Sequence, residues 1–239
     1  MTTMLFREDP YLREAEARVT GHTDEGGIVL DQSLFYPTGG GQPGDSGTLH
    51  WQGNRMDIAT SVKGQGDDIV LVPAEPVALP PVGTWVTQSL NWERRLGHMR
   101  VHTALHLLSV VLPYGVTGGS IGAFKGRLDF DMEEAPDDKE AIEVTLNAFV
   151  EQDFVVRDMW IDEAELDANP DLVKTIGVRP PRGSGRIRMV QIGDGNNQID
   201  LQPCGGTHGA RTGEIGRLRL GRIENKGRNN RRINLHLDS

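Results

Sequence analysis

The sequence predicts an α+β protein, because strand-like and helix-like patterns occupy different parts of the 239-residue chain. Residues 1–90 contain short runs of alternating apolar and polar residues, separated by clusters of Gly, Pro and Asp. After residue 90 a long segment with apolar residues at helical spacing is followed by further strand-like runs. We therefore expect a β-rich N-terminal domain over 1–90 and an α+β domain over 91–239.

The N-terminal strands are bounded by turn-forming residues. Residues 73–83, PAEPVALPPVG, are rich in proline and predict a connector, because proline cannot donate to a sheet ladder. The expected strand-like runs are 27–36, 47–51, 56–62, 68–73 and 84–90.

A long helix is expected directly after the first domain. Asn91 is a suitable N-cap, the apolar residues of 92–112 recur at helical spacing, and Pro113 stops the pattern. The elements expected after it are a Gly-rich turn and strand over 116–132, a helix over 137–152, a strand over 154–161, a short helix over 161–173, and hairpin strands over 186–193, 197–203, 216–227 and 231–237.

Composition excludes several classes of protein. No apolar run approaches the roughly 20 residues of a membrane-spanning helix, and the first residues lack the apolar centre of a signal peptide. A single cysteine among 239 residues excludes a disulfide within the chain and suits a reducing compartment. We therefore expect a cytoplasmic protein that has no membrane contact and no obligate protein partner.

Charge is distributed unevenly along the chain. The net charge is −9, yet residues 211–232 carry eight Lys or Arg against Glu214 and Glu224. The segment RPPRGSGRIR, just upstream, adds four arginines and no acid. This pattern suits a phosphate backbone that is contacted at one place, but it also suits hairpins whose charges keep an edge strand soluble.

Histidine and cysteine spacing indicates a metal site. His98, His102 and His106 are four residues apart and share one helix face. Cys204, the only cysteine, lies four residues before His208 in the segment PCGGTH. Two pairs of nitrogen and sulfur donors at this spacing suit Zn²⁺.

Spacing alone leaves other roles open for these residues. The histidines could be half-buried polar residues, and Cys204 could be a buried small apolar residue or a nucleophile paired with a histidine. The segment from His102 to His106 lacks the Glu that follows the first His in zinc proteases, so that reaction has no base here.

Several motifs together resemble one family. HMRVHTALHLL, PCGGTH, FYPTGGGQPGDSG and ENKGRNNRRI are similar to the editing domain shared by alanyl-tRNA synthetase and the free-standing AlaX proteins, and the resemblance covers nearly the whole chain. It implies a small N-terminal β-barrel-like domain and an α+β editing domain of the kind shared with alanyl- and threonyl-tRNA synthetases. It also implies four zinc ligands at His102, His106, Cys204 and His208, with one zinc per chain.

The function implied by this resemblance is editing in trans. A zinc-dependent hydrolase would deacylate mischarged tRNA(Ala), chiefly the seryl ester, with the glycyl ester as a second candidate. The catalytic group would be a water that the zinc binds or positions. Four protein ligands close a zinc site, however, whereas a catalytic zinc keeps an open position. The alternatives are a non-catalytic, zinc-stapled tRNA-binding module and a zinc hydrolase of small esters or amides.

The resemblance also suggests substrate contacts. The loop FYPTGGGQPGDSG would place Thr38 and Gln42 at the substrate, where Thr38 would bond the seryl hydroxyl; otherwise the loop is a glycine turn between strands. We expect Arg228, Arg231 and Arg232 to contact the tRNA backbone.

Overall fold

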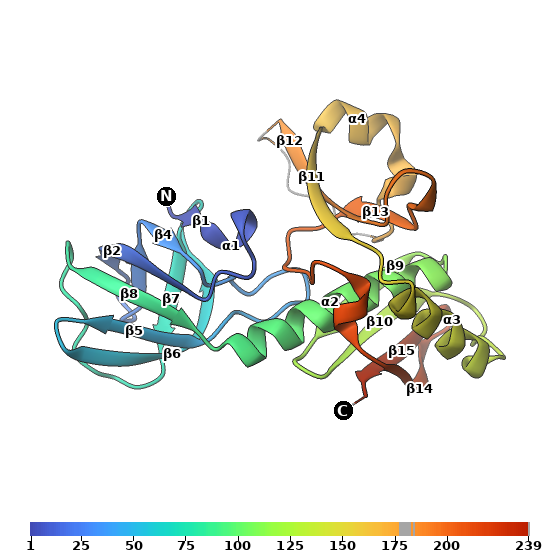
Figure 1. The fold of residues 1–239 in the computed structure, drawn as a ribbon, viewed down its shortest axis with the longest axis horizontal. Helices are drawn as coiled ribbons and strands as arrows, with labels where there is room; N and C mark the ends of the chain where they lie inside the picture. The colour runs from blue at the N-terminus through green and yellow to red at the C-terminus, as the bar shows by residue number, and fades with distance from the viewer. Residues whose placement is uncertain (177–182, 184, 239) are drawn as a thin grey trace. The chain divides into compact units, whose positions relative to one another are not determined.

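The computed structural model describes residues 1–176, 183 and 185–238. The chain forms two compact units, Met1–Gly97 and His98–Ser239, which are described separately (Figure 1). The division falls within the long helix α2 (Trp92–Val111). Helices and strands are both present, and the predicted α+β fold class is confirmed. No helix of the described residues combines the length and the apolar character needed to cross a membrane.

The first unit is built on a closed six-stranded barrel, with the strand order β2-β3-β7-β6-β5-β8 (Figure 1). Buried and exposed residues alternate along its strands, because successive side chains of a pleated strand point to opposite faces. The buried set fills the interior, and the barrel-like N-terminal domain is confirmed. The strands are β2 (Glu14–His22), β3 (Ile28–Leu30), β5 (Gly47–Trp51), β6 (Asn54–Lys63), β7 (Ile69–Pro73) and β8 (Trp85–Leu90).

The strand-like run over 27–36 is divided in the structure. β3 stays in the barrel, whereas β4 (Gln32–Ser33) pairs in parallel with β1 (Thr3–Met4), which precedes the short helix α1 (Leu5–Glu8). The change of partner occurs at Asp31, whose carboxylate accepts a hydrogen bond from the backbone N–H of Arg18 at 2.8 Å. This side-chain bond replaces a ladder bond, and the run cannot continue as one strand.

The glycine-rich stretch over 35–47 packs closely on β6. The backbone N–H of Thr38 donates to the carbonyl of Ser61 at 2.9 Å. A Cβ at Gly44 would lie 2.1 Å from that same carbonyl oxygen, so no larger residue fits at this position. The glycine therefore permits a close backbone approach that holds the loop against the barrel.

A buried ion pair joins this stretch to the start of α2. Arg95 is fully buried, and its Nε donates to the Asp45 carboxylate at 2.9 Å. The other guanidinium nitrogens reach the backbone carbonyls of Pro10 and Leu34 at 2.9 and 2.5 Å. Every nitrogen of the guanidinium thus has an acceptor, which is the condition for burying such a charge. α2 begins as expected, because the Asn91 side chain accepts from the N–H of Arg94 at 3.2 Å.

The second unit contains the rest of α2 and two antiparallel sheets, with the strand orders β14-β15-β10-β9 and β11-β12-β13 (Figure 1). The predicted helix over 161–173 is shorter than expected and ends before Pro170, where a 3₁₀ turn follows. The elements are β9 (Val116–Ile121), β10 (Lys125–Asp131), α3 (Lys139–Glu151), β11 (Val156–Asp162), α4 (Glu163–Ala168), β12 (Arg186–Ile192), β13 (Asp200–Pro203), β14 (Leu218–Gly227) and β15 (Asn230–Leu237).

Helices α2 and α3 cover one face of the four-stranded sheet. A Cβ at Gly126 in β10 would lie 2.6 Å from a methyl carbon of Val101, so glycine is what lets α2 approach the sheet. Leu128 and Leu235 of the sheet belong to the same apolar core as Leu146 of α3. Because strand residues alternate between faces, the intervening polar residues point to the opposite face.

Candidate metal centre

Four metal-ligating side chains converge in the second unit. His102 and His106 project from one face of α2, Cys204 follows β13, and His208 lies in the loop after it. Their candidate ligand atoms all lie within 4.8 Å of one another. The Cys204 sulfur is 3.4 Å from Nε2 of His102 and 3.3 Å from Nε2 of His208. The three histidines are almost fully buried, and the cluster can therefore hold a metal ion away from bulk water.

The His106 ring is oriented by a carboxylate. Its Nδ1 lies 3.0 Å from Oδ2 of Asp200, a fully buried side chain. Lys174 donates to the other Asp200 oxygen at 2.5 Å, and the amide of Gln202 donates to Oδ2 at 2.8 Å. A histidine whose Nδ1 is held in this way presents Nε2 to a metal.

The His208 ring is oriented by a hydroxyl. Thr103 Oγ1 donates to the carbonyl of Met99 at 2.9 Å, so its oxygen is an acceptor toward Nδ1 of His208 at 3.2 Å and toward the N–H of Gly209. This arrangement places the ring proton on Nδ1 and leaves the Nε2 lone pair facing the cluster. Two imidazoles are thus pre-oriented by neighbours that sequence spacing did not identify.

The loop that carries Cys204 is held by both backbone and side-chain donors. The N–H of Gly206 points at the sulfur from 3.4 Å, and the guanidinium of Arg188 donates to the carbonyls of Cys204 and Gly206 at 2.9 and 3.1 Å. Arg188 comes from the basic segment that was a candidate for phosphate contact, and here it braces the loop. Arg179 and Arg182 of that segment lie outside the described residues.

Electrostatics favour a thiolate at the centre of the cluster. Burial opposes ionisation of Cys204, but the charges of His102 and His208 and hydrogen bonds from the rings outweigh it and hold the thiol pKa well below its ordinary value. Burial also disfavours charge on His106, yet bonds to Asp200 and Cys204 raise its pKa to about 9. Burial and the charge of His102 lower the pKa of His208, which keeps that ring neutral.

His98 is not one of the four clustered side chains. It is buried one helical turn before His102, as the motif comparison in the sequence indicated. Spacing on one helix face therefore identified a neighbour together with the two candidate ligands.

The proposed substrate contacts lie in the first unit. Thr38 is exposed, and its hydroxyl donates to the carbonyl of Ser61 at 3.2 Å and accepts from the N–H of Gly44 at 2.9 Å. Gln42 is buried, and its backbone pairs with Gly39. The glycine turn, which the sequence offered as the alternative role of this loop, is therefore present.

The three arginines expected at the tRNA backbone have different environments. Arg228 is exposed in the turn between β14 and β15. Arg231 donates to Asn225 and to backbone carbonyls around the turn. Arg232 makes a two-pronged bond to the Asp129 carboxylate at 2.8 and 3.0 Å. Arg231 and Arg232 thus already support the hairpin itself.

A barrel unit, followed by an α+β unit with a buried three-histidine and one-cysteine cluster, defines a two-unit protein with a candidate metal centre. Residues 10–94 match the family model described as tRNA synthetases class II (A), and residues 187–234 match the threonyl and alanyl tRNA synthetase second additional domain. Cys204 and His208 fall within the second match.

Relatives extend the comparison to the whole chain. The alanyl-tRNA editing protein AlaX-M of Methanosarcina acetivorans is 33% identical over 98% of both chains, and that of Methanosarcina barkeri is 32% identical over the same share. The alanine–tRNA ligase of Pyrobaculum arsenaticum is 36% identical over 93% of this chain, which spans 25% of the ligase. The chain belongs to the AlaX-M family of alanyl-tRNA editing proteins.

Proposed function

We propose that the protein is a hydrolase that edits tRNA(Ala) in trans, removing serine, and glycine as a second substrate, from the mischarged molecule. The observation that carries the proposal is the oriented His102, His106, Cys204 and His208 cluster in a chain of the alanyl-tRNA editing family. An aminoacyl ester is a reactive bond, and its hydrolysis needs a positioned water more than a complex set of catalytic groups. Such an activity belongs in the cytoplasm, where aminoacyl-tRNA is used.

Zinc is the metal that the donor set fits best. Three imidazoles and a thiolate are the borderline-soft ligands that Zn²⁺ prefers. Around a tetrahedral zinc, with Zn–S about 2.3 Å and Zn–N about 2.0 Å, ligand atoms stand roughly 3.5 Å apart. The Cys204–His102 and Cys204–His208 separations of 3.4 and 3.3 Å agree with this spacing. When bound, zinc would lower the pKa of a water or hold the substrate while water attacks.

The residues of this chain prepare the site in defined ways. Asp200 accepts a hydrogen bond from the Nδ1–H of His106, and Thr103 accepts one from the Nδ1–H of His208, so both rings offer Nε2. Gly206 stabilises the Cys204 thiolate through its N–H. The buried position of the histidines limits the access of bulk water.

A second candidate is a non-catalytic tRNA-binding module stapled by zinc. The specific observation in its favour is that all four donors already lie together, which is typical of a closed structural site. The two candidates differ in turnover, because only the hydrolase consumes mischarged ester.

The deciding experiment is deacylation of Ser-tRNA(Ala), Gly-tRNA(Ala) and Ala-tRNA(Ala) in parallel. The hydrolase predicts catalytic release of serine, weaker release of glycine and sparing of alanine. Loss of seryl ester at the rate of the protein-free control would leave the binding module as the function. An enzyme that hydrolyses small amino acid esters but no aminoacyl-tRNA would indicate a general esterase instead.

Selectivity for serine is proposed to rest on Thr38, with Gln42 beside it as a substrate contact. Since the Thr38 hydroxyl hydrogen points to Ser61, its oxygen would accept a bond from the seryl hydroxyl. An alanyl ester would leave that capacity unused. Because the Thr38 side chain is exposed in the protein alone, discrimination of about 1–3 kcal/mol requires that the bound substrate buries this contact.

The test of Thr38 compares two substitutions. Thr38→Val keeps the shape and removes the hydroxyl, so it should lower the ratio of kcat/KM for Ser-tRNA(Ala) to that for Ala-tRNA(Ala) by about tenfold or more. Thr38→Ser keeps the hydroxyl, with its bonds to Ser61 and Gly44, and is the matched control. A ratio within twofold of the wild type in Thr38→Val would remove Thr38 from the proposal.

The proposed tRNA contacts at Arg228, Arg231 and Arg232 are unequal candidates. Arg228 is exposed and has the freedom to meet a phosphate, whereas replacement of Arg231 or Arg232 would also break bonds within the hairpin. Arg228→Gln is therefore the substitution that tests this contact without disturbing the fold.

A further inference from the structure

The face of the four-stranded sheet opposite α2 is hollowed and rich in cations. Two adjoining hollows of about 650 and 590 Å³ share Arg222 and His236 in their walls. Their charged lining consists of Lys125, Arg127, Lys139, Arg219, Arg222 and Glu224. Five cations and one carboxylate on a protein with net charge −9 make this groove a distinct positive surface.

Strand register explains why these side chains gather. Lys125 of β10 pairs with His236 of β15, which in turn pairs with Arg219 of β14. Three strands therefore place three basic side chains in one row across the sheet, at intervals of about 4.8 Å. These residues lie far apart in the sequence, so the basic C-terminal segment alone did not reveal the contribution of β10.

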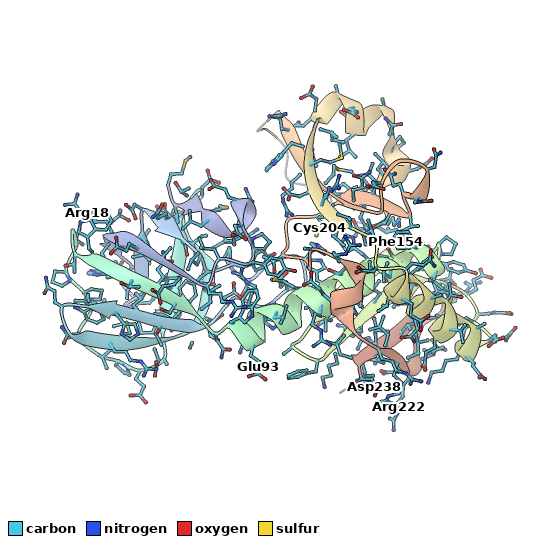
Figure 2. All side chains as sticks on the ribbon, viewed as in Figure 1. Arg18, Glu93, Phe154, Cys204, Arg222 and Asp238 are labelled. Atoms are coloured by element: carbon cyan, nitrogen blue, oxygen red, sulfur yellow. The ribbon has the colours of Figure 1, made fainter. Side chains whose placement is uncertain are left out.

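Most of these cations are not neutralised within the protein. Among the described residues, Arg127 pairs with Asp129 at 2.6 Å, and Glu224 pairs with Lys226 at 2.9 Å. Lys125, Lys139, Arg219 and Arg222 form no ion pair with a carboxylate of the described residues. Figure 2 shows Arg222 projecting away from the ribbon, and its side chain is exposed.

The positive charges of the groove affect the pKa of its histidine, His236. Burial, followed by the charges of Arg219, Lys125 and Lys139, lowers the pKa of His236 below its ordinary value. Like charges held together in this way are costly unless an anion joins them. The arrangement is therefore suited to a polyanion rather than to a neutral or cationic partner.

The rest of the lining indicates which polyanion. Ser120, Asn234 and His236 add neutral hydrogen-bonding groups that suit phosphate and ribose oxygens. Among the described residues that line the groove, only His236 is aromatic, so an unpaired base finds no larger ring on which to stack. Contacts of this kind follow the backbone of a nucleic-acid helix and do not read its bases.

We propose that this groove, formed by β9, β10, β15 and β14, binds the phosphate backbone of a helical arm of the tRNA substrate. The proposal rests on the proposed function for the identity of the RNA. It assigns tRNA docking to Lys125, Arg219 and Arg222, in addition to the exposed Arg228 at the hairpin turn. The sheet separates this surface from α2, which carries two of the candidate metal ligands.

The test measures binding of uncharged tRNA(Ala) against salt concentration. The groove variant is Arg219→Gln/Arg222→Gln, with Lys125→Gln added in a second step. The matched control is Arg55→Gln/Arg157→Gln, which removes two exposed arginines outside the groove. Loss of two phosphate contacts should reduce the slope of log K against log salt by about 1.5 and weaken binding at low salt by about tenfold.

Further arms distinguish the possible outcomes. The groove variant should weaken binding of tRNA(Ala) and of a tRNA with another identity by the same factor, and it should still hydrolyse a small seryl ester at the wild-type rate. Equal effects of the groove and control variants would overturn the proposal, as would a slope that changes only in Arg228→Gln. The groove is tested by the binding of uncharged tRNA, and the proposed function is tested by seryl deacylation. A protein that fails to deacylate Ser-tRNA(Ala) would therefore refute the proposed function, while the binding data alone would support or overturn the groove.

Discussion

Both units bury a group of polar side chains, and the two groups are built on opposite principles. In the first unit the Arg95 guanidinium is surrounded by acceptors, namely the Asp45 carboxylate and two backbone carbonyls. In the second unit three imidazoles and a thiol point ligand atoms at a common centre. In the first group every guanidinium nitrogen has an acceptor within the protein, whereas the second group becomes satisfied when a cation joins it.

This contrast gives a rule for classifying a buried polar cluster. Where donors and acceptors match within the protein, as at Arg95, the cluster fixes the fold. Where several acceptor atoms converge and their outer nitrogens are held by neighbours such as Asp200 and Thr103, the cluster is prepared for a ligand. Four predictions test this distinction, in order of decreasing expected effect.

Removal of two candidate ligands should abolish metal binding. His102→Ala/Cys204→Ala is expected to reduce the metal content from near one zinc per chain to a trace and to lower seryl deacylation on the order of a hundredfold or more. Elemental analysis of protein purified without chelator measures the first effect. His98→Ala, one turn away on the same helix face, is the control and should keep its metal. Unchanged zinc in the double variant would refute the ligand assignment.

Disruption of the ion pair should affect stability instead. Arg95→Met leaves the Asp45 carboxylate buried without its charge partner and is expected to destabilise the first unit by about 3–5 kcal/mol. Urea unfolding measures the loss, and elemental analysis should show normal zinc. Arg95→Met/Asp45→Leu removes both charges and should recover part of the stability. A loss below about 1 kcal/mol in the single variant would show that the pair is dispensable.

Removal of the carboxylate behind His106 should weaken metal binding without abolishing it. Asp200→Asn keeps the shape but loses the charge that orients the ring, and a roughly 10- to 100-fold decrease in zinc affinity is expected. Competition with a chromogenic chelator measures the affinity. Asp194→Asn, at an exposed carboxylate of the second unit, serves as the control. Equal affinities in the two variants would reduce Asp200 to a purely structural residue.

The ion pairs of Asp129 should produce the smallest effect, visible only as a pH dependence. Burial disfavours its charge, but bonds from Arg232 and Arg127 outweigh burial and lower its pKa below the usual 3.8. A lowered pKa means that the carboxylate stabilises the folded protein above its unfolded-state pKa and loses this contribution as pH falls through the folded-state pKa. The stability advantage over Asp129→Asn, about 1 kcal/mol or less, should therefore persist from pH 7 to 5 and decrease as the pH falls below the unfolded-state value of 3.8 and through the folded-state pKa.

Urea unfolding of both proteins between pH 7 and 3 measures this difference. A stability advantage of the wild type that grows as the pH falls would contradict the assignment, because it would require a raised pKa for Asp129.

Much of the fold followed from local patterns. Alternation in the first 90 residues predicted five of the six barrel strands but missed β2, and Asn91 with the following apolar spacing predicted α2. These patterns succeed because the side-chain period of an element is a property of its own residues. They failed at two places. At Asp31 the side chain bonds the backbone N–H of Arg18, and the following β4 pairs with β1 instead of the barrel. At Pro170 the proline ends the helical pattern, so α4 is shorter than expected.

The four clustered side chains, His102, His106, Cys204 and His208, were predicted from the sequence. Spacing alone also included His98, and the resemblance to the editing family selected the four. The neighbours that orient these rings could be found only in the folded chain, since Asp200 is 94 residues from His106 in sequence. The same holds for the basic groove, where Lys125 meets Arg219 through the register of β10, β15 and β14. Side chains act on one another through space, and long-range pairing brings together charges and hydrogen-bond partners that no local pattern records.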